Sequence, residues 1–154
     1  RDAGMVEVYA ANLIRLGDHG AAERIIERTL KSGWSIALVR QYGYAQGYDV
    51  SRQLAQAESW LAAHPEEPQL LLCLGRLSAR AKLWGKARDY FESSYRLERS
   101  AEICAELGRL LTALGDARTA SAYFGEGLLL RENYLPELPM PDKTTSDSIL
   151  LARF

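Results

Sequence analysis

The sequence is poor in the residues that cross-link, ligate or anchor a chain. Its 154 residues include two cysteines and two histidines, and 19 Lys and Arg stand against 20 Asp and Glu. Cys73 and Cys104 lie in apolar runs without a CxxC spacing, which excludes a secreted disulfide framework and favours buried thiols. A formal net charge of −1 argues against nucleic acid as a partner. No run approaches the roughly 18–20 apolar residues that cross a bilayer, so the chain itself is expected to be soluble.

Catalytic motifs are missing as well. The sequence has no GxxxxGK[ST] phosphate loop, no GxGxxG after a strand and no HExxH motif. His19 is expected in a turn and His64 at a helix end, where each interacts with solvent or a helix terminus rather than with a metal. We therefore predict no catalytic, cofactor-binding or metal-binding residues, and a protein that is not an enzyme.

What the chain has instead is an internal repeat. Leu74-Gly75-Arg76-Leu77 recurs 33 residues later as Leu107-Gly108-Arg109-Leu110. The same shift relates three further residues to Ala120, Tyr123 and Phe124, namely Ala87, Tyr90 and Phe91. This period, and the order of Leu-Gly, alanine and aromatic residue, resemble the tetratricopeptide repeat (TPR), a unit of two helices. The resemblance implies an all-α, right-handed superhelix of about four helix pairs.

Caps and apolar spacing divide the chain into units at about 3–33, 34–67, 68–100 and 101–131, followed by a proline-rich tail over 132–154. Helices are predicted over 6–16 and 21–31 around a turn at 17–20, over 68–80, and over 101–113 and 117–130. Pro68 suits a first helical turn, and Ser100 is a predicted N-cap. Gly75 and Ala87 are expected to let their two helices approach closely.

The second unit departs from the pattern. Ala57 and Leu61 come 14 and 18 residues after Gly43, whereas the third unit has spacings of 12 and 16. The sequence therefore predicts a helix over 36–46, a longer turn at 47–51 and a shortened second helix that ends near His64 and Pro65. After residue 130, three prolines within 135–141 exclude helix. Residues 148–154 are expected to form an apolar turn that caps the last unit.

The first helix of each unit is expected to present the concave face of the superhelix. Arg76 and Arg109 occupy equivalent positions there, and Arg80 lies one turn beyond Arg76. Together they predict a basic strip that binds a carboxylate or phosphate of a partner. The alternative is that these arginines pair with Glu102 and Glu106. The Lys and Asn set of the TPR carboxylate clamp is absent.

Tyrosines gather in the second unit, where Tyr42, Tyr44 and Tyr48 follow one another closely. Aromatic side chains beside a groove often anchor a partner, and we include Tyr42 among the predicted partner-binding residues. The alternative is that Tyr42 packs between repeats.

A closer resemblance rests on five segments, at residues 37–43, 57–65, 70–77, 83–88 and 127–130. Together with the Leu-Pro-rich tail they are similar to the carboxy-terminal part of the HemY family, bacterial inner-membrane proteins associated with protohaem and tetrapyrrole biosynthesis. The resemblance implies a fragment of a larger protein with two amino-terminal membrane helices, which hold this domain on the cytoplasmic side. It implies a non-catalytic scaffold whose partners are haem-biosynthesis enzymes, and no catalytic residues to carry over.

Two other functions stay open. In the first, the concave groove binds haem or a porphyrin, with arginines on the propionates. In the second, the chain is a generic TPR scaffold of a bacterial envelope system, such as polysaccharide or lipopolysaccharide assembly. Two membrane helices upstream of this domain would favour the HemY interpretation over the second alternative.

Overall fold

The computed structural model describes residues 2–142, and over this range the chain is helical without a strand. Eight α-helices and one short 3₁₀ helix, η1, follow in order: α1 (Ala3–Arg15), α2 (His19–Ser32), α3 (Ile36–Tyr42), α4 (Val50–Ser59), η1 (Trp60–Ala62), α5 (Pro68–Arg80), α6 (Trp84–Leu97), α7 (Ala101–Ala113) and α8 (Ala117–Arg131). None of the helices in this range is long and apolar enough to span a bilayer.

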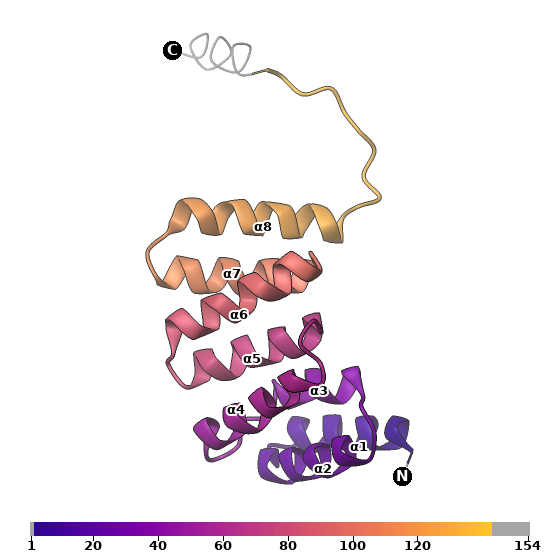
Figure 1. Ribbon diagram of the computed structural model, residues 1–154. Coiled ribbons are helices and arrows are strands. Elements are labelled where there is room, and N and C mark those ends of the chain that lie inside the picture. The colour runs from indigo at the N-terminus through magenta and orange to yellow at the C-terminus, as the bar shows by residue number, and fades with distance from the viewer. Residues whose placement is uncertain (1, 143–154) are drawn as a thin grey trace.

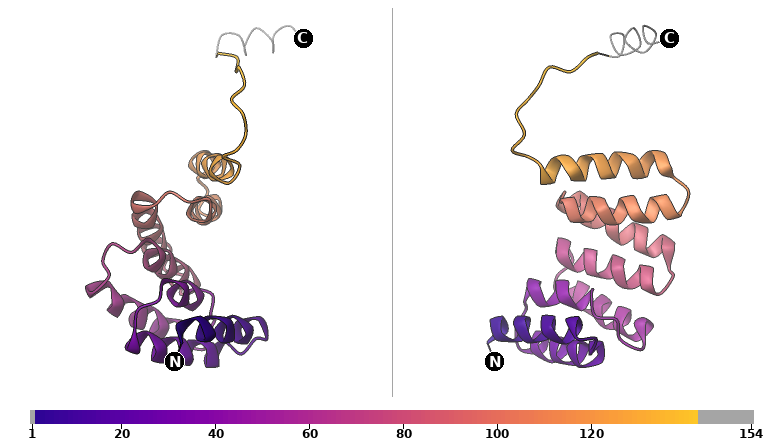
Figure 2. Two further views of the ribbon diagram at one scale, coloured as in Figure 1. Left: turned by 90° about the vertical axis from the view of Figure 1, so that its right-hand side faces the viewer. Right: turned by 180° about the vertical axis from the view of Figure 1, so that it is seen from behind.

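Successive helices form antiparallel pairs that stack into an elongated array (Figure 1). The pairs α1–α2, α5–α6 and α7–α8 pack tightly, and α3 and α4 both pack on α5. The amino terminus lies at one end of the stack and α8 at the other, as the two further views also show (Figure 2). The expected all-α stack of helix pairs is therefore present.

The helices of the third and fourth units match the prediction because local sequence sets their ends. Helices α5 and α7 have the expected bounds, and the Ser100 hydroxyl caps α7 by accepting a hydrogen bond from the amide of Ile103 at 3.2 Å. Gly115 turns the chain between α7 and α8 at φ +90°. Lys82, 33 residues earlier, adopts φ +62° in the equivalent turn.

The predicted boundaries of the first two units need correction. His19 is the first residue of α2 rather than a turn residue. Helix α3 ends at Tyr42 instead of residue 46, and the connection to α4 runs over residues 43–49. The physical reason is tertiary: Gln53 donates hydrogen bonds to the carbonyls of Tyr42 and Ala45, at 3.0 and 2.8 Å. These bonds satisfy carbonyls at the end of α3 and hold the chain in a loop.

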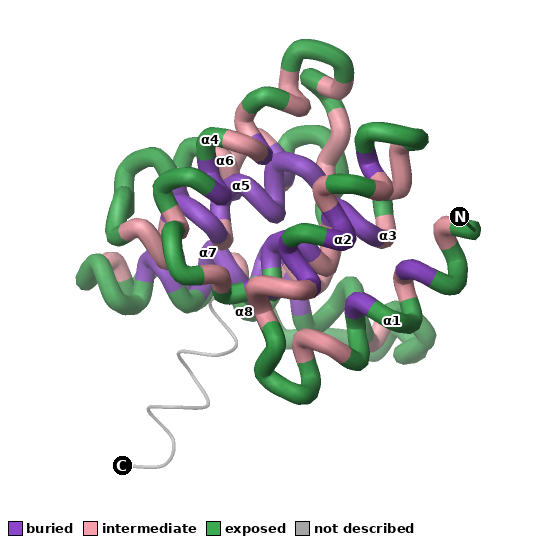
Figure 3. The backbone as a smooth tube through the Cα atoms, turned by 90° about the horizontal axis from the view of Figure 1, so that it is seen from below, coloured by how far each residue is buried: buried purple, intermediate pink, exposed green. Residues whose placement is uncertain are grey.

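The core runs through the middle of the stack, where α5 is buried along much of its length (Figure 3). Gly75 faces the ring of Phe91 on α6, and a Cβ at this position would overlap that ring, so the expected close approach of the two helices is confirmed. Cys73 and Cys104 are buried free thiols, as predicted. Burial raises the pKa of Cys73 to about 12.

Beyond α8, residues 135–142 have no regular secondary structure, and the chain runs away from the stack (Figures 1 and 2). The apolar cap expected over residues 148–154 lies outside the described residues.

Candidate functional site

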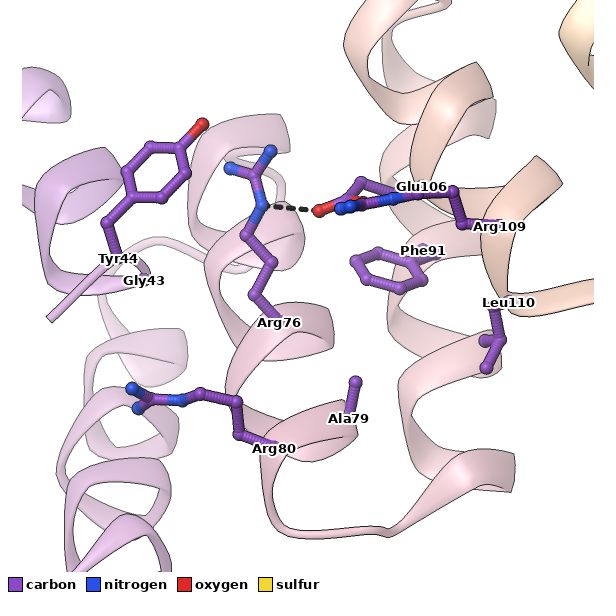
Figure 4. Close-up of a pocket in the computed structure, with 9 residues that line it drawn as sticks. All are labelled: Gly43, Tyr44, Arg76, Ala79, Arg80, Phe91, Glu106, Arg109 and Leu110. Atoms are coloured by element: carbon purple, nitrogen blue, oxygen red, sulfur yellow. Dashed lines mark hydrogen bonds and ion pairs between the residues drawn. The ribbon is translucent and has the colours of Figure 1, made fainter. Parts of the chain in front are cut away.

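One groove on the surface collects residues from three successive units (Figure 4). Gly43 and Tyr44 come from the loop after α3, and Phe91 comes from α6. Helix α5 contributes Arg76, Ala79 and Arg80, and α7 contributes Glu106, Arg109 and Leu110. The groove has a volume of about 380 Å³, within the range of about 300–1,000 Å³ that is typical of ligand sites. Stacking of the repeats thus converts scattered sequence positions into one surface.

Arg76 lies at the centre of the groove and joins two units. Its Nε donates a hydrogen bond of 2.6 Å to Glu106, and its Nη2 lies 3.4 Å from Glu102. Its guanidinium carbon stands 4.6 Å from the centroid of the Tyr44 ring. Burial alone would lower the pKa of Arg76, but the hydrogen bond and charge of Glu106, with the charge of Glu102, raise it above the ordinary value. Arg76 is therefore a charged residue held in place by α7.

Arg109 is the arginine that faces solvent. Its side chain is 73 % exposed, whereas that of Glu106 is 7 % exposed and that of Arg76 is 12 % exposed. Its Nε donates a hydrogen bond of 2.9 Å to Glu106, which leaves Glu106 shared between two arginines. Because Arg40 also pairs with Glu102, three arginines share two acids and leave a positive excess at this point. A partner carboxylate would meet it here.

Arg80 has a different role from the one expected. Its Nη1 donates a 2.7 Å hydrogen bond to the carbonyl of Ala45, and its Nη2 donates a 2.7 Å bond to the side-chain oxygen of Gln53. Burial lowers its pKa. Its buried Nε has no hydrogen-bond partner among residues 2–142. Arg80 lines the groove, but its guanidinium holds the loop after α3 against α5.

Tyr42 is misplaced in the prediction. Its side chain is wholly buried, it packs edge-on against Trp60 with ring centroids 4.9 Å apart, and its hydroxyl donates a 2.6 Å hydrogen bond to Glu27. Burial and this hydrogen bond raise its pKa. A side chain in the core cannot touch a partner, so Tyr42 leaves the candidate site. Tyr44, two residues on, is exposed and takes its place in the groove.

The two histidines lie apart from the groove. His64 stacks on Trp34 with ring centroids 3.6 Å apart, and the Nδ1 of His19 accepts a 3.0 Å hydrogen bond from the amide of Gln46. Among residues 2–142, no three His, Cys, Asp or Glu side chains gather in a way that could hold a metal ion.

Sequence reasoning missed Tyr44, although a signal was present. If Tyr42-Gly43 matches Leu74-Gly75, then Tyr44 matches Arg76, and both take the position that Arg109 takes in the fourth unit. The residue before the glycine is buried in each case, and the residue after it faces the groove. The same alignment places Tyr42 in the core.

The fold has solved counterparts. The chain is similar to MamA, residues 41 to the end, from Desulfovibrio magneticus RS-1, with a TM-score of 0.65, 19% identity, and coverage of 86% of this chain and 77% of that one. It is also similar to TTC0263, a thermophilic TPR protein of Thermus thermophilus, with a TM-score of 0.72, 19% identity, and coverage of 84% and 74%. No protein-family model and no curated protein matches the chain. The fold is a TPR solenoid.

Proposed function

We propose that the chain is a non-catalytic scaffold that holds a segment of a partner protein in the groove between Tyr44 and Arg109. The observation that carries this proposal is the convergence of three units on one surface, with an exposed guanidinium beside an exposed aromatic ring. Arginine and tyrosine are the residue types that most often dominate binding energy at protein interfaces. The groove suits an extended segment that carries a carboxylate.

We further propose that the partners are haem-biosynthesis enzymes, and that the chain works at the cytoplasmic face of the bacterial inner membrane. This finer proposal is supported by the resemblance to the HemY family. One segment of that resemblance, residues 83–88, forms the end of the α5–α6 turn and the start of α6, with Leu83 and Trp84 exposed. A TPR turn does not require these side chains, which is why the segment favours the specific family over a generic repeat.

Replacing Arg109 by glutamate is expected to weaken capture of a haem-biosynthesis enzyme by about tenfold or more, because one charge-assisted hydrogen bond contributes about 1.5–3 kcal/mol. The measurement is the dissociation constant of the full chain with each purified enzyme of the pathway. Arg109 is the right position because its side chain is largely exposed, so the helices keep their packing. Reversing Arg76 instead would place a third acid beside Glu102 and Glu106 and confuse binding with stability.

The matched control is Arg28→Glu, the same charge change at an exposed position of α2 outside the groove. Arg28→Glu should bind like the unaltered chain, and both variants should keep the same helical circular dichroism. Equal loss in the two variants would point to net charge rather than the groove. Unchanged capture by Arg109→Glu would refute the site.

Haem or a porphyrin is the second candidate, favoured by the same exposed arginine and tyrosine over a hollow of ligand size. The donor set argues against iron ligation, because no His, Cys or Met is among the residues that line the groove. We expect haem titrated into the chain to give no saturable one-to-one shift of the Soret band at micromolar concentration. A saturable shift that Arg109→Glu removes would make this candidate the function.

A further inference from the structure

The chain leaves one described segment uncovered beyond α8. In residues 134–141, Tyr134, Leu135, Leu138 and Met140 are all exposed, although each is large and apolar. The segment reaches out from the end of the stack instead of lying along it (Figures 1 and 2). Apolar side chains gathered in this way on an extended segment usually mark an interaction site.

The sequence of this segment prepares it to bind in an extended form. Leu135, Leu138 and Met140 each directly precede a proline. Proline fixes its own φ and drives the preceding residue to extended or polyproline backbone, so little conformational entropy is left to lose on binding. In a polyproline path of three residues per turn, Leu135 and Leu138 share one edge, and Glu137 projects from another.

The groove is complementary to that segment. Ala79, Phe91 and Leu110 supply apolar lining, and Tyr44 supplies an aromatic wall of the kind that accepts prolines. Arg109 supplies an exposed guanidinium with which the carboxylate of Glu137 can form a paired hydrogen bond. Apolar edge, proline and single acid of the segment thus each have a counterpart in the groove.

We propose that residues 134–141 of one molecule bind in the groove of a second copy of this chain. The inference rests on the proposed function, since it uses the same groove and names an occupant for it. A second copy is favoured over the same molecule because the segment leads away from its own stack (Figure 2). The chain then competes with its own partners for one site, and partner binding becomes sensitive to the concentration of the chain.

The test uses sedimentation equilibrium of the full chain and two variants, one with the altered groove, Arg109→Glu, and one with the altered segment, Leu135→Ser with Leu138→Ser. The unaltered chain should self-associate, and each variant alone should do so about tenfold more weakly or not at all. An equimolar mixture of the two variants should form a one-to-one heterodimer, because one intact segment meets one intact groove. Glu137→Arg should likewise pair with Arg109→Glu.

A chain that stays monomeric at high concentration overturns the inference, and so does association that survives in both variants. A mixture of variants without heterodimer shows that the segment occupies its own groove, which also overturns it. The proposed function fails separately, through unchanged capture of haem-biosynthesis enzymes by Arg109→Glu. Self-association without enzyme capture keeps this inference and refutes that function.

Discussion

Gly75→Ala is expected to destabilise the chain by about 2 kcal/mol, within the range of about 1–3 kcal/mol for overpacking a well-filled core. A Cβ at Gly75 would overlap the ring of Phe91 on α6. The ring cannot move aside, because Phe91 is only 3 % exposed and belongs to the cluster between α5 and α7. Helices α5 and α6 must therefore separate. Urea unfolding of the full chain, followed by circular dichroism, measures the change.

Gly108→Ala is the matched comparison, since the same Leu-Gly-Arg-Leu sequence surrounds both glycines. A Cβ there would overlap the ring of Phe124, but Phe124 is 42 % exposed and can rotate into solvent. Alanine also gains about 1 kcal/mol of helix propensity over glycine. We expect the cost of Gly108→Ala to lie at least about 1 kcal/mol below that of Gly75→Ala. Equal costs would show that the exposure of the facing ring does not decide the outcome.

The sequence predicts the helices best where short-range chemistry ends them. Pro68 begins α5, Ser100 caps α7 and Gly115 supplies the left-handed turn, and each of these effects acts over a few residues. The end of α3 is different, because side chains of Gln53 and Arg80 hold the carbonyl of Ala45 from 8 and 35 residues away. A local pattern cannot anticipate such bonds, so it predicts a helix that is too long.

The candidate site divides along the same line. Periodicity places Arg76 and Arg109 on one face because repeats stack with a constant register, and the structure brings both into the groove. It cannot assign them different roles, since exposure depends on which acids α7 presents. Residue type alone singles out Tyr42, whereas its register is what buries it. Arg80 lies on the predicted face, but its guanidinium is bound to the loop of the preceding unit.

Glu106→Ala is expected to destabilise the chain by about 3 kcal/mol, the lower end of the cost of removing one partner from a buried ion pair. Glu106 accepts the 2.6 Å hydrogen bond of Arg76, and both side chains are largely withdrawn from water. Without it, Arg76 keeps only the 3.4 Å approach to Glu102 among its ion pairs within residues 2–142. The cost stays at the lower end because that second acid remains. Denaturant unfolding with Glu92→Ala as the control measures it; Glu92 pairs with Arg88 one turn away on α6 at a half-exposed position, so its loss should cost about 0.5 kcal/mol or less.

A double-mutant cycle separates the ion pair from the packing around it. Arg76→Met with Glu106→Leu removes both charges and keeps apolar volume, so its stability should return to within about 1 kcal/mol of the unaltered chain, because desolvation of the pair offsets most of its attraction. If Glu106→Ala costs no more than Glu92→Ala, the pair does not hold the third unit to the fourth. The double variant should nevertheless bind partners poorly, because Arg109 loses the carboxylate that orients it and the groove loses the cation beside Tyr44. Stability recovered without binding would show that this ion pair serves the groove more than the fold.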